Sequence, residues 1–145
     1  MRALIQRVTE GKVTVDKKVV GEIGSGIVIL LGITHEDSEK DAETLVNKIV
    51  NLRTFPSGDK HFETSLLDEQ KEILVVSQFT LYGSTKKGRR PDFFSAAKPD
   101  LAERLYNFFV QKCQETGLKV ATGQFQAMMN VSLVNEGPVT FLLET

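Results

Sequence analysis

The chain has 145 residues and a formal net charge of −1, with 41% hydrophobic and 26% charged residues. This balance excludes a disordered or fibrous chain and predicts one globular domain over residues 1–145. The longest apolar run, residues 27–33, is much shorter than the roughly 20 residues that span a bilayer, so we expect no membrane segment. A single cysteine excludes an internal disulfide, and the opening residues become polar too soon for a signal peptide. The sequence therefore predicts a cytoplasmic protein.

The first third of the chain has the pattern of β-strands. Residues 2–8 are rich in apolar side chains, and residues 12–15 alternate between polar and apolar as a half-buried strand does. A turn at 16–18 and a returning strand at 19–23 complete a predicted hairpin. Residues 27–33 are apolar at successive positions, which predicts a central strand covered on both faces.

A helix is predicted next, capped by Ser38 and ended by the turn at residues 55–59. Its apolar residues recur every three or four positions, as one buried face of a helix requires. They are Ala42, Leu45, Val46, Ile49 and Val50.

The remaining elements follow the same logic. A buried strand is predicted over 73–79, a long basic loop over 83–99 and a second helix over about 100–116. Three more strands fit the end of the chain. We therefore expect an α+β fold, with a mainly antiparallel, barrel-like sheet that carries two helices. The ranges of the last three strands are 118–122, 128–134 and 138–143.

Common catalytic motifs are absent. His35 and His61 lie in polar segments with no second histidine or cysteine at metal-binding spacing, so we expect neither a metal nor a cofactor. The sequence has no G-x-S-x-G elbow and no glycine-rich phosphate loop. A hydrolase triad of that type and a nucleotide-binding loop are therefore not expected.

Two segments are unusual. Ser77-Gln78-Phe79-Thr80-Leu81 places hydroxyl and amide groups at the end of a buried strand, where each unpaired group would cost about 1–3 kcal/mol. These groups either bond neighbouring backbone or line a polar pocket. Asn135-Glu136-Gly137-Pro138-Val139-Thr140 lies between two predicted strands. Its Gly-Pro pair is either an ordinary turn or, if the bond is cis, a rigid projection of two main-chain carbonyls.

A basic cluster follows the first of these segments. Because the net charge is close to zero, nucleic-acid binding would have to come from such a local patch. The alternative is a solvated surface loop. The basic cluster consists of Lys86, Lys87, Arg89 and Arg90.

These segments together resemble the D-aminoacyl-tRNA deacylase family, whose two signature motifs correspond to residues 77–81 and 135–140. Other matching segments occur in the same order, so the resemblance covers the whole chain. The chain departs from the family pattern at Glu136, where aspartate is commoner, at Gln126, where glycine is usual, and in the 55–63 loop. The further matches are at 6–8, 27–32, 87–93 and 123–129.

The resemblance implies a homodimer that hydrolyses the ester between a D-amino acid and tRNA, with no cofactor and no membrane partner. It implies that Gly137-Pro138 is cis and enters the pocket of the partner subunit. There its carbonyls would collide with an L side chain and leave room for a D side chain. Because glycine has no side chain to reject, glycyl-tRNA is expected as a further substrate.

The resemblance also assigns residues to the site. Ser77, Gln78, Phe79 and Thr80 would form the catalytic segment, in which backbone N–H groups stabilise the oxyanion. A covalent role for Ser77 or Thr80 stays open, although neither has a base at readable spacing.

By the same resemblance, Arg7 would hold the Gly137-Pro138 pair, with an ordinary surface arginine on a strand as the alternative. Phe125 and Met129 would line the pocket near the terminal adenine, with core packing as the alternative. The basic cluster would contact acceptor-stem phosphates.

Two other classes of function fit the residues taken alone. One is an RNA-binding barrel without catalysis, which hydrolysis of D-tyrosyl-tRNA would exclude. The other is a small structural domain in which Gly137-Pro138 is only a turn. A trans peptide there, or a stable monomer with a closed pocket, would favour it.

Overall fold

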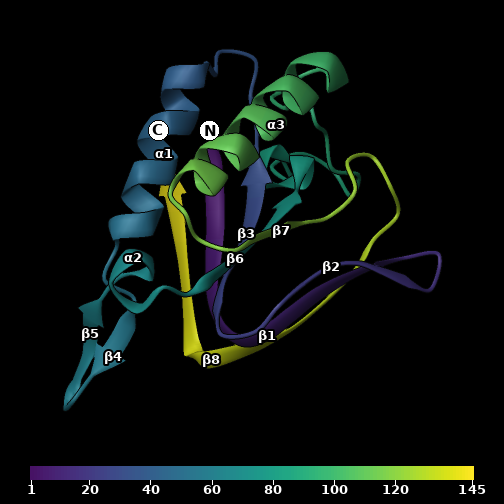
Figure 1. Cartoon of the computed structure of the whole chain (residues 1–145). Coiled ribbons are helices and arrows are strands. Elements are labelled where there is room, and N and C mark those ends of the chain that lie inside the picture. Colours follow the sequence, from purple (N-terminus) through teal and green to yellow (C-terminus); the bar gives the residue numbers. More distant parts are fainter.

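A computed structural model describes all 145 residues. One curled sheet carries helices on one of its faces (Figure 1). The strands of this sheet are β1 (Arg2–Val15), β2 (Lys18–Ile23), β3 (Gly26–Gly32), β6 (Glu72–Ser77), β7 (Val120–Thr122) and β8 (Asn130–Glu144). The helices are α1 (Glu39–Asn51), α2 (Leu66–Glu69) and α3 (Pro99–Glu115). A 3-10 turn, η1 (Phe79–Tyr82), follows β6, and β4 (Phe55–Ser57) pairs with β5 (Lys60–Thr64) in a separate hairpin.

The sheet is mixed, so the prediction of a mainly antiparallel sheet was wrong. Its order is β2-β1-β3-β6-β7, with β8 on the other edge of β1. β1 pairs antiparallel with β2, β3 and β8, whereas β3–β6 and β6–β7 are parallel. The parallel pairs arise because α1 lies on the connection from β3 to β6, and α3 on that from β6 to β7. Parallel neighbours require such long crossovers.

The prediction of two helices was also incomplete. The third helix, α2, is a single turn, in which Ser65 and Asp68 form a reciprocal capping box. Four residues are too few to show the apolar periodicity that identified α1 and α3. The β4–β5 hairpin lies where a simple helix-ending turn was expected.

Two long bent strands replace four predicted short ones. β1 is continuous over 14 residues and β8 over 15. A side chain at Gly11 would meet Val28 Cγ2 at 2.8 Å, so glycine lets β1 pass closely over β3. At the two ends of the sheet, Gly21 of β2 approaches the backbone of Thr122 in β7 so closely that a side chain would not fit. This contact almost closes the sheet into a barrel.

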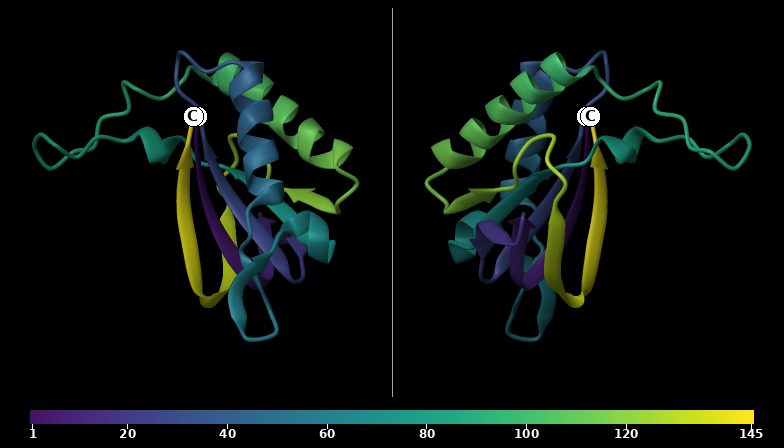
Figure 2. Two further views of the ribbon diagram at one scale, coloured as in Figure 1. Left: turned by 90° about the vertical axis from the view of Figure 1, so that its left-hand side faces the viewer. Right: turned by 90° about the vertical axis from the view of Figure 1, so that its right-hand side faces the viewer.

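The main core lies between the sheet and the two long helices. The five apolar residues predicted for the first helix are all buried in α1, and Leu105, Phe109 and Cys113 are buried in α3. A smaller cluster, with Val8, Val28 and Leu74 among its members, fills the inside of the curl. The loop between η1 and α3 projects away from this body (Figure 2). No helix is long and apolar enough to cross a membrane.

The main core yields a prediction for stability. Phe109 has no exposed surface, so Phe109→Ala should lower the free energy of unfolding by about 3–5 kcal/mol. Phe94, which is 87% exposed, offers the matched control. Phe94→Ala should change the value by less than about 0.5 kcal/mol in the same urea titration. Equal losses for both variants would contradict this assignment of the core.

Candidate active site

A cleft of about 1020 Å³ opens at the end of β6. Its wall comes from the end of β6, the start of η1, the base of the projecting loop, the start of α3, the segment between β7 and β8, and the start of β8. It therefore joins six parts of the chain. The residues that line it are Val76, Ser77, Gln78, Phe79, Phe93, Ala96, Ala97, Pro99, Ala102, Phe125, Gln126, Ala127, Met128, Met129 and Val131.

The start of η1 carries two backbone donors. Phe79 and Thr80 are its first residues, so their N–H groups have no acceptor within the turn. The preceding N–H, that of Gln78, is already bonded to the carbonyl of Leu31 at 2.8 Å. Two adjacent free N–H groups at a cleft can stabilise a developing oxyanion.

Glycine allows η1 to lie against β3. A side chain at Gly32 would meet Leu81 Cβ at 3.0 Å and the carbonyl oxygen of Gln78 at 3.2 Å. Because β3 ends in this residue, the turn can pack directly on the strand end. The position of the two donors is thus fixed by the rigid centre of the sheet.

No side chain that lines the cleft is acidic, basic, histidine, cysteine or tyrosine. The nearby tyrosines do not supply a base either. Burial, with Asp37 as the next cause, raises the pKa of Tyr82 to about 12. Burial also raises the pKa of Tyr106 to about 12, and its hydroxyl donates to the carbonyl of Val75 at 2.9 Å. The cleft therefore offers backbone N–H donors and the neutral polar side chains of Ser77, Gln78 and Gln126, but no ionisable side chain of its own.

The structure brings most of the predicted catalytic and pocket residues together. Ser77, Gln78, Phe79, Phe125 and Met129 all line the cleft. Phe125 and Met129 also pack against the larger and smaller core clusters respectively, so pocket lining and core packing are both realised. The side chain of Thr80 lies outside the lining and accepts a hydrogen bond from the amide of Gln78.

The second signature segment lies elsewhere, on a bulge of β8. Gln6 pairs with Thr140 and Val8 with Asn135, so residues 136–139 all lie opposite Arg7. The Gly137-Pro138 peptide is cis, as the resemblance implies, and both residues are exposed. The side chain of Asn135 closes the bulge by accepting from the N–H of Val139 at 2.7 Å.

The side chain of Arg7 holds this bulge by a hydrogen bond to its backbone. This side chain is 10% exposed and donates from Nε to the carbonyl of Glu136 at 3.1 Å. Its Nη1 donates to the carbonyl of Thr54 at 2.7 Å. The predicted contact of Arg7 with this segment is therefore present, and it also ties the bulge to the chain that follows α1.

The cleft and the bulge are far apart within one chain. Ser77 pairs with Leu31 and Leu31 with Ala3, while the bulge lies opposite Arg7. Arg7 is four residues beyond Ala3, or about 13 Å along β1, and three strand spacings across the sheet add about 14 Å. Gly137 and Pro138 do not line the cleft of their own chain.

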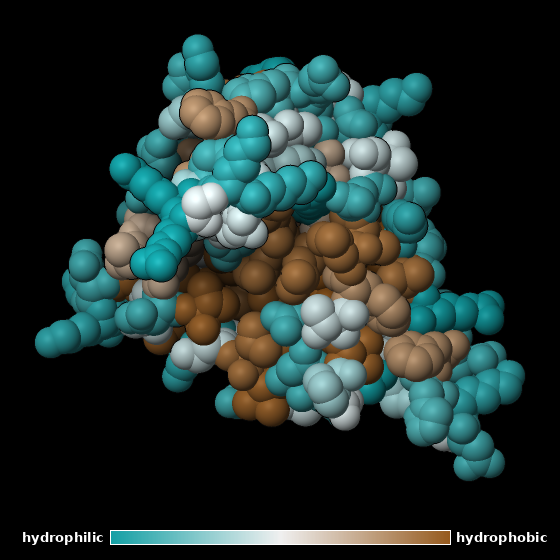
Figure 3. Space-filling model, turned by 180° about the vertical axis from the view of Figure 1, so that it is seen from behind, coloured by the Kyte–Doolittle hydropathy of each residue, from teal (hydrophilic) through white to brown (hydrophobic).

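An apolar surface lies beside the cleft, on the face of the sheet away from the helices. Apolar side chains gather in the middle of this face, bordered by polar ones (Figure 3). The register places Leu142, Leu4 and Leu30 side by side across β8, β1 and β3. Leu142, on the edge strand β8, is 55% exposed, whereas Leu4 and Leu30 are half-buried.

The basic cluster sits at the tip of the projecting loop. All four of its side chains are exposed, and none takes part in a salt bridge of the chain. At the base of the projecting loop, the backbones of Ser84 and Asp92 pair with each other. The cluster is therefore free to bind an external anion.

Sequence reasoning missed much of the cleft wall. Phe93 packs edge-on against Phe79, with ring centroids 5.0 Å apart, and small residues at the start of α3 leave the space open. Nothing local marks these residues as pocket-forming. Within this wall, the sequence marked Gln126 as a departure from the glycine of the family pattern. Its φ of 61° lies in the left-handed region that favours glycine.

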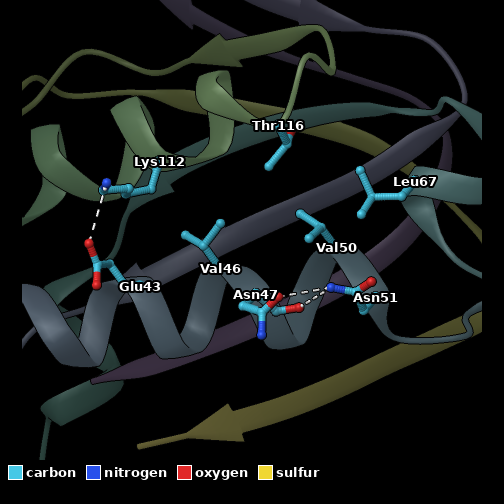
Figure 4. Close-up of a pocket in the computed structure, with 8 residues that line it drawn as sticks. All are labelled: Glu43, Val46, Asn47, Val50, Asn51, Leu67, Lys112 and Thr116. Carbon is cyan, nitrogen blue, oxygen red and sulfur yellow. Dashed lines mark hydrogen bonds and ion pairs between the residues drawn. The ribbon is translucent and has the colours of Figure 1, made fainter.

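A second hollow, of about 340 Å³, lies between α1 and α3 (Figure 4). An ion pair of 3.3 Å between Glu43 and Lys112 crosses it, and none of the predicted site residues lies there. This hollow is a surface groove between two packed helices. The larger cleft is the candidate active site.

Comparisons with known proteins identify the family of the chain. The sequence model of the family described as D-Tyr-tRNA(Tyr) deacylase matches residues 4–144. Proteins named D-aminoacyl-tRNA deacylase from Bacillus cereus (strain AH187) and Bacillus thuringiensis (strain Al Hakam) are 53% and 52% identical over 145 residues. Each match covers 100% of this chain and 99% of the relative.

Solved structures show the same fold. One titled c-Myc DNA Unwinding Element Binding Protein superposes with a TM-score of 0.93 at 44% identity, over 100% of this chain and 99% of the other. One titled as a probable eukaryotic D-amino acid tRNA deacylase superposes with a TM-score of 0.86 at 18% identity, over 99% and 98%. The second is evidence for the fold alone. From the family match and the full-length identity above 50%, the chain belongs to the D-Tyr-tRNA(Tyr) deacylase family.

Proposed function

We propose that the protein hydrolyses the ester bond of D-aminoacyl-tRNA and releases the free D-amino acid and tRNA. Family membership supports this, and so does a cleft with two unpaired N–H groups and no ionisable side chain. The whole chain would act as one catalytic domain. The cytoplasm is the expected compartment, because the substrate is tRNA.

In this proposal the N–H groups of Phe79 and Thr80 bind the oxyanion that forms when water attacks the ester carbonyl. The cleft supplies no general base, so the 2′-hydroxyl of the terminal ribose would position or activate the water. Phe125 and Met129 would contact the terminal adenine. Ser77 and Gln78 would line the cleft beside the reacting ester.

The protein would act as a homodimer in which each cleft receives the bulge of the partner. The single observation that carries this is the separation of the bulge from the cleft in its own chain, by about 13 Å along β1 and about 14 Å across the sheet. On the face beside the cleft, exposed Leu142 and half-buried Leu4 and Leu30 supply apolar surface that a second copy would bury.

The bulge would provide chirality by exclusion. The carbonyls of the partner's Gly137 and the partner's Pro138 would lie against the substrate's alpha carbon, where an L side chain collides and a D side chain points away. A main-chain wall is suited to this role because it does not depend on the conformation of a side chain. Glycyl-tRNA would also be hydrolysed, since glycine presents nothing to exclude.

The experiment that tests the function compares purified protein on D-tyrosyl-, L-tyrosyl- and glycyl-tRNA. We expect hydrolysis of the D and glycyl esters, and at least about 100-fold slower hydrolysis of the L ester, which corresponds to about 2.7 kcal/mol. Binding without hydrolysis of any ester would identify a non-catalytic RNA-binding barrel. Hydrolysis of D-tyrosyl-tRNA with no action on glycyl-tRNA would contradict exclusion as the source of chirality.

A second prediction separates the backbone donors from a covalent nucleophile. Thr80→Ala should retain activity within about tenfold, because the side chain of Thr80 lies outside the cleft lining and its hydroxyl accepts from Gln78. Phe79→Pro should be about 100- to 1000-fold slower than Phe79→Ala, because it removes one oxyanion donor. Phe79 begins the turn, where proline is tolerated, so the fold should survive.

Single-turnover hydrolysis of D-tyrosyl-tRNA measures both effects, and circular dichroism checks the fold. A loss beyond about 1000-fold for Thr80→Ala, with the fold intact, would establish Thr80 as the nucleophile. Equal rates for Phe79→Pro and Phe79→Ala would remove the N–H of Phe79 from the mechanism.

A third prediction concerns the basic cluster. If its four cations contact phosphates, tRNA affinity should fall with salt at a log–log slope of about −3 to −4. Arg89→Ala should reduce the magnitude of that slope by about 1, whereas Lys17→Ala, in the distant turn between β1 and β2, should leave it unchanged. Filter binding with uncharged tRNA gives both values. Equal slopes for the two variants would exclude the cluster as the phosphate site.

A further inference from the structure

The side chain of Arg2, at the start of β1, makes three contacts, two of them with the end of the η1 turn that begins at the cleft. Its Nη1 donates to the carbonyl of Leu81 at 2.8 Å, and its guanidinium carbon lies 4.6 Å from the ring centroid of Tyr82. Its Nε donates to the carboxylate of Glu144 at 2.5 Å. One planar group therefore holds the end of η1 and the end of β8.

The contact with Leu81 fixes the turn that carries the oxyanion donors. The N–H groups of Phe79 and Thr80 point from the start of η1, and Leu81 and Tyr82 form its other end. The start of the turn is bonded to β3 through Gln78. Arg2 contacts the other end, through Leu81 and Tyr82, so together with the packing on Gly32 it constrains the orientation of the turn.

The contact with Glu144 alone does not explain this arrangement. Both side chains are partly solvated, with 38% of Arg2 and 52% of Glu144 exposed, and such pairs contribute little to stability. The planar guanidinium can stack on Tyr82 while it donates to Leu81, a combination that a lysine ammonium reproduces only in part. These two contacts concern the turn, not the strand pairing of β1 with β8.

We propose that Arg2 is a positioning residue that sets the geometry of the N–H groups of Phe79 and Thr80 for ester hydrolysis. This inference rests on the proposed deacylase function. In this proposal, loss of Arg2 lowers the rate of ester hydrolysis. Arg7, which lies farther along β1, contacts the bulge that is proposed to exclude L-aminoacyl groups. The two arginines therefore affect different measurable quantities.

The test uses full-length Arg2→Met and Arg2→Lys, with Glu144→Gln as the matched control that weakens the ion pair but keeps the bond to Leu81. For D-tyrosyl-tRNA, Arg2→Met should lower kcat by about 10- to 100-fold, because a small misplacement of oxyanion donors has an effect of this size. KM, the affinity for uncharged tRNA and the ratio of D to L hydrolysis should change by less than about twofold. Arg2→Lys, which can still donate to Leu81, should recover part of the loss, and Glu144→Gln should stay within about twofold of wild type.

Amide NMR chemical shifts distinguish a local change in the η1 turn from a general loss of stability. In Arg2→Met, the shifts of Phe79 and Thr80 should change, while that of Val139 in the bulge should not. A kcat within twofold of wild type for Arg2→Met would overturn the inference, as would an equal loss for Glu144→Gln. If wild type does not hydrolyse D-tyrosyl-tRNA, the proposed function itself fails. If wild type is active and Arg2→Met matches it, only the role of Arg2 fails.

Discussion

Strand β1 keeps the two signature segments of this chain apart. It is paired with β2, β3 and β8, so its length and curvature are set by neighbours on both edges. The turn η1 sits beside its first residues, and the bulge of β8 sits opposite Arg7. Because a rigid strand lies between them, the proposed mechanism needs two copies of the chain, with the turn from one and the bulge from the other.

The same rigidity suits chemistry that uses no catalytic side chain. The proposed oxyanion donors are backbone N–H groups at the start of η1, and the proposed chiral wall consists of backbone carbonyls. Neither can adjust by rotating a side chain, so both must be held from outside. Gly32, Arg2, Arg7 and Asn135 contact these backbone segments directly, and Thr54 accepts from Arg7. Substitution of these supporting residues should therefore affect function more than their distance from the ester suggests.

Sequence reasoning located the elements with strong patterns. The apolar stripes of α1 and α3 and the buried β3 and β6 were confirmed, because burial on a helix face or on both sides of a strand leaves a readable spacing. The signature motifs identified the family, which the comparisons confirmed. The mixed sheet, the continuity of β1 and β8 and the short α2 were missed. These depend on which strands become neighbours and on single capping contacts, which periodicity does not record. The cleft wall from Ala96 to Ala102 was missed because small residues show no pattern until α3 is packed.

The most direct test of the central claim asks whether the bulge acts on its own cleft or on that of the partner. Gly137→Ala should displace the bulge, because the φ of 132° disfavours alanine and its Cβ would meet Val139 Cγ2 at 2.8 Å. Its clefts should then hydrolyse L-tyrosyl-tRNA. Ala127→Trp should fill the cleft and leave the bulge intact. When Gly137→Ala chains exchange with a tenfold excess of folded Ala127→Trp chains, we expect L-tyrosyl-tRNA hydrolysis to fall about tenfold, because about one Gly137→Ala chain in eleven still pairs with its own kind, while D-tyrosyl-tRNA hydrolysis persists. Hydrolysis of the L ester that is unaffected by the second variant would show that the bulge acts within its own chain and would contradict the account.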